Sequence, residues 1–223
     1  MTRARRGLAG TIRAALALAL GLAGCGEKAA QPPTAEGNRA EPARAPLGDV
    51  VRVRLKTEAG DMILALDHKR APVTTENFVR YVDEHRFDGT YFYRAARSKF
   101  AAGRGFVQGG IRHSYRKMLP PIAHEPTSKT GILHKDGTVS MARAALAGAM
   151  GDFFIVVGGA MPEMDAKPGR PDAGFAAFGR VEAGMDVVRK LLAAATVADA
   201  GRGPMRGQMI AKPVRIVKAE RVD

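Results

Sequence analysis

Short apolar segments with the two-residue period of β-strands dominate this chain, and helical periodicity interrupts them only twice. The first such segment, VRVRLKT at residues 51–57, alternates apolar with mostly cationic side chains, as a strand does when one face is buried. Seven further segments have strand character: residues 62–67, 91–95, 106–109, 137–142, 153–158, 175–181 and 212–222. Because so few helices separate these strands, the chain does not read as a βαβ array. We therefore expect a mainly β fold, a small antiparallel barrel or sandwich with two helices.

Two segments carry the helical period. Residues 71–85, APVTTENFVRYVDEH, have Pro72 near their start, and Thr74 or Thr75 is expected to cap the helix through its hydroxyl. The second helix is expected at residues 184–194, where apolar side chains recur at three- and four-residue intervals.

The N-terminus has the pattern of an export signal. Four arginines precede residues 14–24, AALALALGLAG, which carry no charge. This run is shorter than the roughly 20 residues that a membrane-spanning helix needs, and it has the length of a signal-peptide core. It ends in Leu-Ala-Gly before Cys25, the only cysteine of the chain, and this stretch resembles a bacterial lipobox. The resemblance implies cleavage before Cys25 and its acylation, and a plain signal peptide with a chance cysteine is the alternative.

We expect three regions: a signal peptide at residues 1–24, a disordered tether at 25–48 and a folded domain at 49–223. The tether, GEKAAQPPTAEGNRAEPARAPLG after the cysteine, is rich in Pro, Ala, Gly and charge and lacks apolar periodicity. A lipid anchor at Cys25 would place the protein on the periplasmic side of the cell envelope. Gly26, in place of an aspartate, slightly favours the outer membrane.

The net charge of +13 falls to +9 without residues 1–24, and much of the excess lies between residues 94 and 135. We interpret this window as a solvated basic rim, with attraction to acidic clients or envelope polymers as the alternative. An exported protein is not expected to bind nucleic acid. A single cysteine excludes an intramolecular disulfide and a cysteine metal cluster, and the five histidines lack the spacing of metal ligands. No metal or cofactor is expected.

From about residue 50 to 222 the chain resembles the cyclophilin-type peptidyl-prolyl cis-trans isomerases. The segments TEAGDMILAL, APVTTENF, FYR, QGG, GTVSMAR, DFFIVV, AAFGRV and GMDVV occur in the order of that family and nearly at its spacing. The resemblance implies a closed eight-stranded antiparallel β-barrel capped by two α-helices. It also implies an enzyme that accelerates rotation of X-Pro bonds in proline-containing polypeptides. With the lipid anchor at Cys25, these polypeptides are expected in the cell envelope. The oligomeric state is open, with a monomer as the default.

The resemblance assigns the catalytic role to Arg94 at the end of the strand YFYR. Rotation of the X-Pro bond needs no nucleophile, only preferential binding of the twisted bond, and a planar guanidinium can donate to the proline nitrogen as it becomes pyramidal. The residues implied to bind substrate are Tyr93, Phe106, Gln108, Met141, Ala142, Arg143, Phe154, Met164 and Phe175.

Four departures from the family pattern bear on this site. Tyr93 replaces a histidine, and thirteen residues separate Arg94 from Gln108 where the family commonly has fewer. Phe106 and Gly105 occupy two pocket positions that usually hold methionine and phenylalanine, respectively, and an aspartate at position 152 replaces a glutamine. These changes leave a second hypothesis open, a membrane-tethered chaperone or scaffold that binds proline-containing segments with little catalysis.

Overall fold

The computed structural model of the chain describes residues 46–112, 114–143, 148–170 and 173–223. The predicted signal peptide at residues 1–24, the predicted acylation site Cys25 and most of the predicted tether lie outside these ranges. Within them, no helix is both long enough and apolar enough to cross a membrane.

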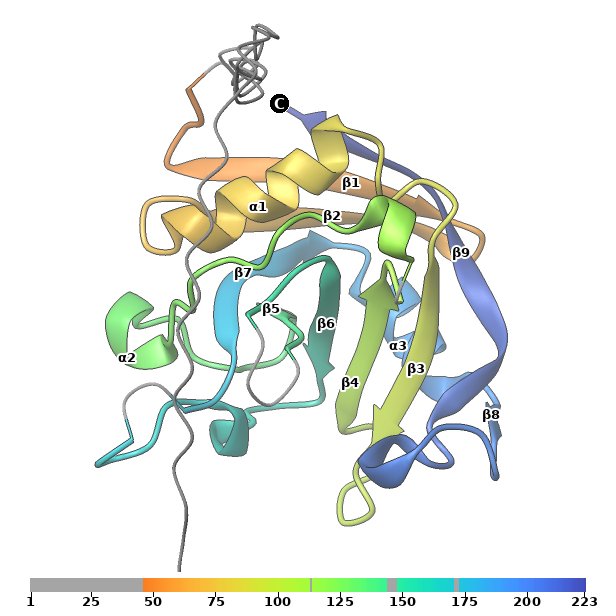
Figure 1. Cartoon of the computed structure of the whole chain (residues 1–223). Coiled ribbons are helices and arrows are strands. Elements are labelled where there is room, and N and C mark those ends of the chain that lie inside the picture. The colour runs from red at the N-terminus through yellow and green to blue at the C-terminus, as the bar shows by residue number, and fades with distance from the viewer. Residues whose placement is uncertain (1–45, 113, 144–147, 171–172) are drawn as a thin grey trace, which may run out of the picture. The chain divides into compact units, whose positions relative to one another are not determined.

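The strands form a closed antiparallel barrel (Figure 1). Their bounds are β1 Val50–Thr57, β2 Gly60–Asp67, β3 Tyr91–Arg97, β4 Gly105–Gly110, β5 Thr138–Met141, β6 Asp152–Val157, β7 Ala176–Ala183, β8 Thr196–Val197 and β9 Met209–Val222. Eight of them pair in the order β1-β2-β7-β5-β6-β4-β3-β9, and β9 pairs back onto β1 to close the ring. The two-residue β8 pairs with β9 beside the barrel. The predicted closed eight-stranded fold is therefore confirmed.

Alternation along the strands fills the barrel with apolar side chains. In β1 the apolar side chains Val51, Val53 and Leu55 are buried in the core, while the cations between them face outward. Aromatic rings occupy the centre, where Phe153 of β6 lies 5.2 Å from the ring of Phe78 in an edge-on arrangement. Phe153 is fully buried and belongs to the barrel core.

Among the described residues, three α-helices accompany the barrel, one more than expected. They are α1 Pro72–Asp83, α2 Thr127–Thr130 and α3 Met185–Ala193. Each of the two longer helices buries one apolar face in the barrel core, and Figure 1 shows α1 lying across one end of the strands. The four-residue α2 is a single turn, too short to leave a periodic signal in the sequence. Short 3₁₀ turns lie at Tyr115–Lys117, Pro162–Met164 and Gly203–Met205.

The expected hydroxyl cap of α1 is wrong, because the cap comes from a distant carboxylate. Ala71 occupies the N-cap position and offers no side-chain hydrogen bond. Instead Glu125, buried at 1% exposure, accepts the backbone N–H groups of Val73 at 3.3 Å and Thr74 at 2.8 Å. The Thr74 hydroxyl donates to the same carboxylate at 2.7 Å rather than to the helix. A negative charge at a helix N-terminus is favoured by the helix dipole, so Glu125 joins α1 to the loop before α2.

Replacement of Glu125 by alanine is expected to lower the free energy of unfolding by about 2–3 kcal/mol, because buried donors at the helix start lose a charged acceptor. Glu125→Gln should cost roughly half as much, since its amide oxygen still accepts. Urea unfolding followed by circular dichroism measures both. Glu76→Ala, an exposed acid on the same helix, is the control and should stay within about 0.5 kcal/mol of wild type. An equal effect of Glu125→Ala and Glu76→Ala would contradict the capping role.

The insertion between Arg94 and Gln108 lengthens the β3–β4 hairpin, whose tip is residues 98–104. Arg97 anchors its base, donating to the carbonyls of Leu192 at 2.9 Å and Ala194 at 2.8 Å at the end of α3. A cation at a helix C-terminus is favoured by the dipole, so this basic residue has a structural partner.

Candidate active site

One cross-strand row on the outer face of the barrel brings the main site residues together. Arg94 of β3 pairs with Gln108 of β4, Gln108 pairs with Phe154 of β6, and Phe154 pairs with Ser140 of β5. Paired residues on adjacent strands share a face of the sheet, and neighbouring strands are roughly 5 Å apart. Chain neighbours of these residues, such as Val107 and Ile155, lie in the core. The row therefore runs along the outer face of four neighbouring strands.

The guanidinium of Arg94 is held at two points. Its Nε donates to Oε1 of Gln208 at 2.8 Å, and its Nη1 donates to Oε1 of Gln108 at 2.8 Å. Its Cζ also lies 4.9 Å from the centre of the Phe106 ring. Burial lowers the pKa of Arg94, but a guanidinium remains protonated in proteins. The two bonds use two of its five N–H donors, so three remain for a ligand.

Tyr93 fixes the amide of Gln108 from the other side. It is the extra residue of a β-bulge, between the pairs that Phe92 and Arg94 make with β4. Its hydroxyl accepts a 2.8 Å hydrogen bond from Nε2 of Gln108, which leaves Oε1 of that amide for Arg94. Burial, followed by the nearby Asp152 carboxylate, raises the pKa of Tyr93, so the hydroxyl stays protonated at neutral pH. The tyrosine, where the resemblance leads one to expect a histidine, thus makes a polar contact to Gln108.

A second apolar cluster, separate from the barrel core, lies beside this row. Its buried members are Phe154, Val156 and Met161, and the half-buried side chains packed against them are Phe106, Ala142, Met164 and Phe175. We call these seven residues the Phe154 cluster. The Phe154 ring centre lies 5.2 Å from that of Phe106 and 5.3 Å from that of Phe175. Phe106 therefore lies next to the arginine as well as next to Phe154, which joins the guanidinium to an apolar surface.

Met141 is a correction to the predicted site. Its side chain is 1% exposed and packs in the barrel core, not in the Phe154 cluster. The reason is strand alternation, because Ser140 faces outward in register with Phe154 and its neighbour must face inward. Ala142 belongs to the Phe154 cluster, and Arg143 follows it with a half-buried side chain.

A cavity of about 530 Å³ opens elsewhere, among Thr127, Leu133, Asp165 and the loop at residues 166–169. It contains neither Arg94 nor any member of the Phe154 cluster, so we do not assign it as the substrate site. In the part of the chain that the structure describes, no group of three or more His, Cys, Asp or Glu side chains is arranged to hold a metal ion.

Gln208 is a site residue that sequence reasoning missed. It lies 114 positions from Arg94 and reaches it only because β9 pairs with β3. No local motif marks such a residue.

For the isomerase activity that the resemblance implies, Gln208→Ala is expected to lower kcat/KM on a proline peptide about tenfold, because Arg94 loses one of its two fixed acceptors and about 1–1.5 kcal/mol of orientation. Steady-state isomerisation assays measure the change. Arg206→Ala, an exposed substitution in the same loop, is the control and should leave kcat/KM within about twofold of wild type. Unchanged kcat/KM in Gln208→Ala would show that Gln108 alone suffices to hold Arg94.

Comparison with known proteins agrees with this geometry. The sequence model of the family described as cyclophilin type peptidyl-prolyl cis-trans isomerase/CLD matches residues 52–221. Peptidyl-prolyl cis-trans isomerase A of Dickeya dadantii is 36% identical over 140 residues, which are 62% of this chain and 70% of the relative. A peptidyl-prolyl cis-trans isomerase of Acinetobacter baylyi is 31% identical over 169 residues, which are 75% of this chain and 84% of the relative.

The fold has its own counterpart among solved structures. A cyclophilin type peptidyl-prolyl cis-trans isomerase of Cryptosporidium parvum, crystallised in the presence of the dipeptide Ala-Pro, superposes with a TM-score of 0.58. The match covers 77% of this chain and 99% of that structure at 17% sequence identity, so it speaks for the fold. Since the family model spans nearly the whole barrel and the strand order closes as the resemblance implied, the chain belongs to the cyclophilin-type peptidyl-prolyl cis-trans isomerase family.

Proposed function

We propose that this peptidyl-prolyl cis-trans isomerase acts on proline-containing polypeptides of the cell envelope, with Arg94 as its catalytic residue. The observation that carries the assignment of Arg94 is its doubly anchored guanidinium, placed directly beside the half-buried apolar side chains of the Phe154 cluster.

The chemistry requires only that the twisted X-Pro bond be bound better than either planar form. Amide resonance opposes rotation with a barrier of roughly 18–20 kcal/mol, and rotation localises a lone pair on the proline nitrogen. Arg94 retains three N–H donors beyond its bonds to Gln108 and Gln208, and one of them can donate to that lone pair. Because the guanidinium is held before substrate arrives, it needs little reorganisation in the transition state.

Binding of the substrate divides between an apolar and a polar part. The Phe154 cluster offers aromatic and methionine side chains for the proline ring. Gln108 uses one of its two amide N–H groups on Tyr93 and keeps the other for a carbonyl next to the proline. The two parts together would hold the peptide on both sides of the rotating bond.

Refolding assays separate this enzyme from the alternative, a tethered binding module. A small protein whose refolding is limited by proline isomerisation, a step of tens to hundreds of seconds, serves as substrate. We expect one molecule of this protein to accelerate the slow phase of many substrate molecules. A module that only binds would slow or block refolding in proportion to its own concentration, and that result would contradict the proposal.

The envelope location is a separate part of the proposal and rests on the uncharged run before Cys25 and on the absence of any other cysteine from the sequence. Labelling with an alkyne fatty acid in a bacterial host tests it. We expect the wild-type protein to take up the label and to fractionate with membranes as a monomer. The Cys25→Ser variant should not be labelled and should remain as the uncleaved precursor. Release of an unlabelled, processed wild-type chain would show a plain signal peptide instead.

A further inference from the structure

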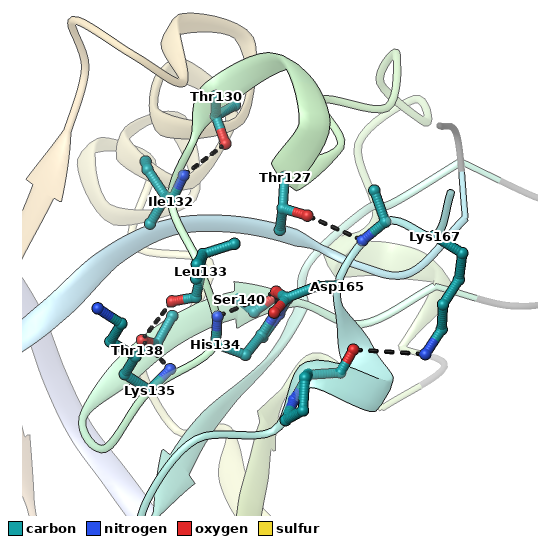
Figure 2. Close-up of polar contacts among 12 residues, drawn as sticks. Thr127, Thr130, Ile132, Leu133, His134, Lys135, Thr138, Ser140, Asp165 and Lys167 are labelled. Atoms are coloured by element: carbon teal, nitrogen blue, oxygen red, sulfur yellow. Dashed lines mark hydrogen bonds and ion pairs between the residues drawn. The ribbon is translucent and has the colours of Figure 1, made fainter. Parts of the chain in front are cut away.

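A buried histidine, His134, lies at the end of the site row opposite Arg94. His134 is 1% exposed, and its Nδ1 lies 2.6 Å from Oδ1 of Asp165 (Figure 2). Its Nε2 lies 2.9 Å from the hydroxyl of Ser140, the residue that pairs with Phe154 in the row. A carboxylate only accepts, so Nδ1 carries the proton toward Asp165 and Nε2 accepts from Ser140.

These three residues have the contacts of a hydrolytic triad but not its access. A nucleophilic serine must reach a substrate carbonyl, and a base must be oriented by its acid. Ser140 has 0% exposure in the middle of β5, so no substrate can approach its hydroxyl. The arrangement therefore has to be explained by what its own atoms hold in place.

The ring of His134 lies against Phe154. The two ring planes differ by 10° and their centres are 5.8 Å apart, an offset stacked arrangement. Phe106 and Phe175 also contact the ring of Phe154. The orientation of Phe154, the central residue of the Phe154 cluster, thus depends on a ring that two hydrogen bonds hold.

The same pair also joins the loops that carry the cluster's other members. The backbone N–H of His134 donates to Oδ1 of Asp165 at 3.0 Å, and its carbonyl accepts from the N–H of Met161 at 2.8 Å. Asp165 closes the turn Pro162–Met164, and Phe175 donates its N–H to the carbonyl of Met164 at 3.0 Å. Met161, Met164 and Phe175 therefore lie on segments that these hydrogen bonds connect to His134 and Asp165.

We propose that His134 is a positioning residue for proline binding: held by Ser140 and Asp165, it fixes the Phe154 ring and the 161–165 segment against the substrate. This inference rests on the proposed use of the Phe154 cluster as the proline site. His134 does not contact the rotating bond. The catalytic role remains with Arg94 at the other end of the row.

The chemistry of the ring fits this role. Burial lowers the pKa of His134, although Asp165 and Glu163 oppose the shift, so the ring is neutral and can accept from Ser140. A positioning residue of this kind affects the binding of the proline more than the rate at which the bound peptide isomerises. Its loss is therefore expected to raise KM and to leave kcat nearly unchanged.

The test compares His134→Phe, Asp165→Ala and Asp165→Asn on an Ala-Pro peptide. His134→Phe keeps a ring but loses both hydrogen bonds, and Asp165→Ala removes the carboxylate that holds it. We expect both to raise KM about tenfold with kcat within about twofold of wild type. Asp165→Asn keeps an acceptor oxygen and should restore KM to within about threefold of wild type.

Thr138→Ala is the matched control. The hydroxyl of Thr138 bonds the backbone of Leu133 and Lys135 in the same loop but has no described contact with the Phe154 cluster (Figure 2). The Thr138→Ala substitution should loosen this loop and leave KM unchanged. An equal KM increase in Thr138→Ala, or unchanged KM in Asp165→Ala, would overturn the proposal.

Peptide titration keeps this inference distinct from the proposed function. Affinity for an Ala-Pro peptide, followed by chemical shifts at temperatures where every variant is folded, needs no turnover. If wild type binds but does not isomerise, the proposed function fails, while about tenfold weaker binding in His134→Phe still supports the positioning role. Equal affinity in wild type and His134→Phe would overturn the positioning role even in an active enzyme.

Discussion

Replacing Arg94 by alanine is expected to lower kcat/KM for an X-Pro peptide about 100- to 1000-fold, the effect of losing one preorganised donor to a developing charge. The loss should fall mainly on kcat, because the Phe154 cluster that binds the proline ring remains. The free energy of unfolding should change little, since removal of the half-buried Arg94 side chain lets water reach the amide oxygens of Gln108 and Gln208.

Arg94→Lys is the informative control for this prediction. Lysine keeps the charge but lacks the planar fork that lets one side chain satisfy Gln108 and Gln208 together. We expect it to recover less than about tenfold of the alanine loss. Stopped-flow isomerisation assays at several peptide concentrations give kcat and KM for each variant. Full activity in Arg94→Lys would mean that charge alone matters and that the fixed geometry does not.

The adjacent pair Phe153 and Phe154 should separate stability from function. Phe153→Ala is expected to lower the free energy of unfolding by about 3–5 kcal/mol, because it opens a cavity in the barrel core. While folded, that variant should keep its kcat/KM. Phe154→Ala should lose about 30- to 100-fold in kcat/KM, the effect of removing the apolar contact of one large ring.

Urea unfolding and peptide kinetics on the same two preparations check this pair. The neighbours have the same chemistry and differ only in which side of β6 they occupy. Phe154→Ala should also lose some stability, but less than Phe153→Ala, since its cluster is small and lies outside the core. If Phe153→Ala lost the activity and Phe154→Ala kept it, the outer face would not be the substrate face.

The strands were predictable from local patterns, whereas the choice of a closed barrel over a sandwich came from the family resemblance. Alternation places Val51 and Phe153 inward without any tertiary information, and each hairpin follows from its neighbouring strands. The same rule, applied to β5, would have placed Met141 inward and Ser140 outward, so that error came from transferring a motif without its alternation.

The rest of the site depends on pairs far apart in the chain. Gln208 meets Arg94 through barrel closure, and Glu125 meets the start of α1 across 51 positions from Thr74. His134 gives no motif because its partners are a strand serine and an aspartate 31 positions away. Such contacts carry no periodic signal, so they appear only when the barrel is assembled.

Exchange spectroscopy on an Ala-Pro peptide tests the central claim most directly, since it measures rotation of the bond at equilibrium. Wild type and Arg94→Ala are compared at equal occupancy, with affinity measured in the same samples. We expect wild type to accelerate exchange at substoichiometric concentration, and Arg94→Ala to bind the peptide with exchange slowed about 100-fold or more relative to wild type. Binding without acceleration by wild type, or equal exchange rates for the two proteins, would contradict the account.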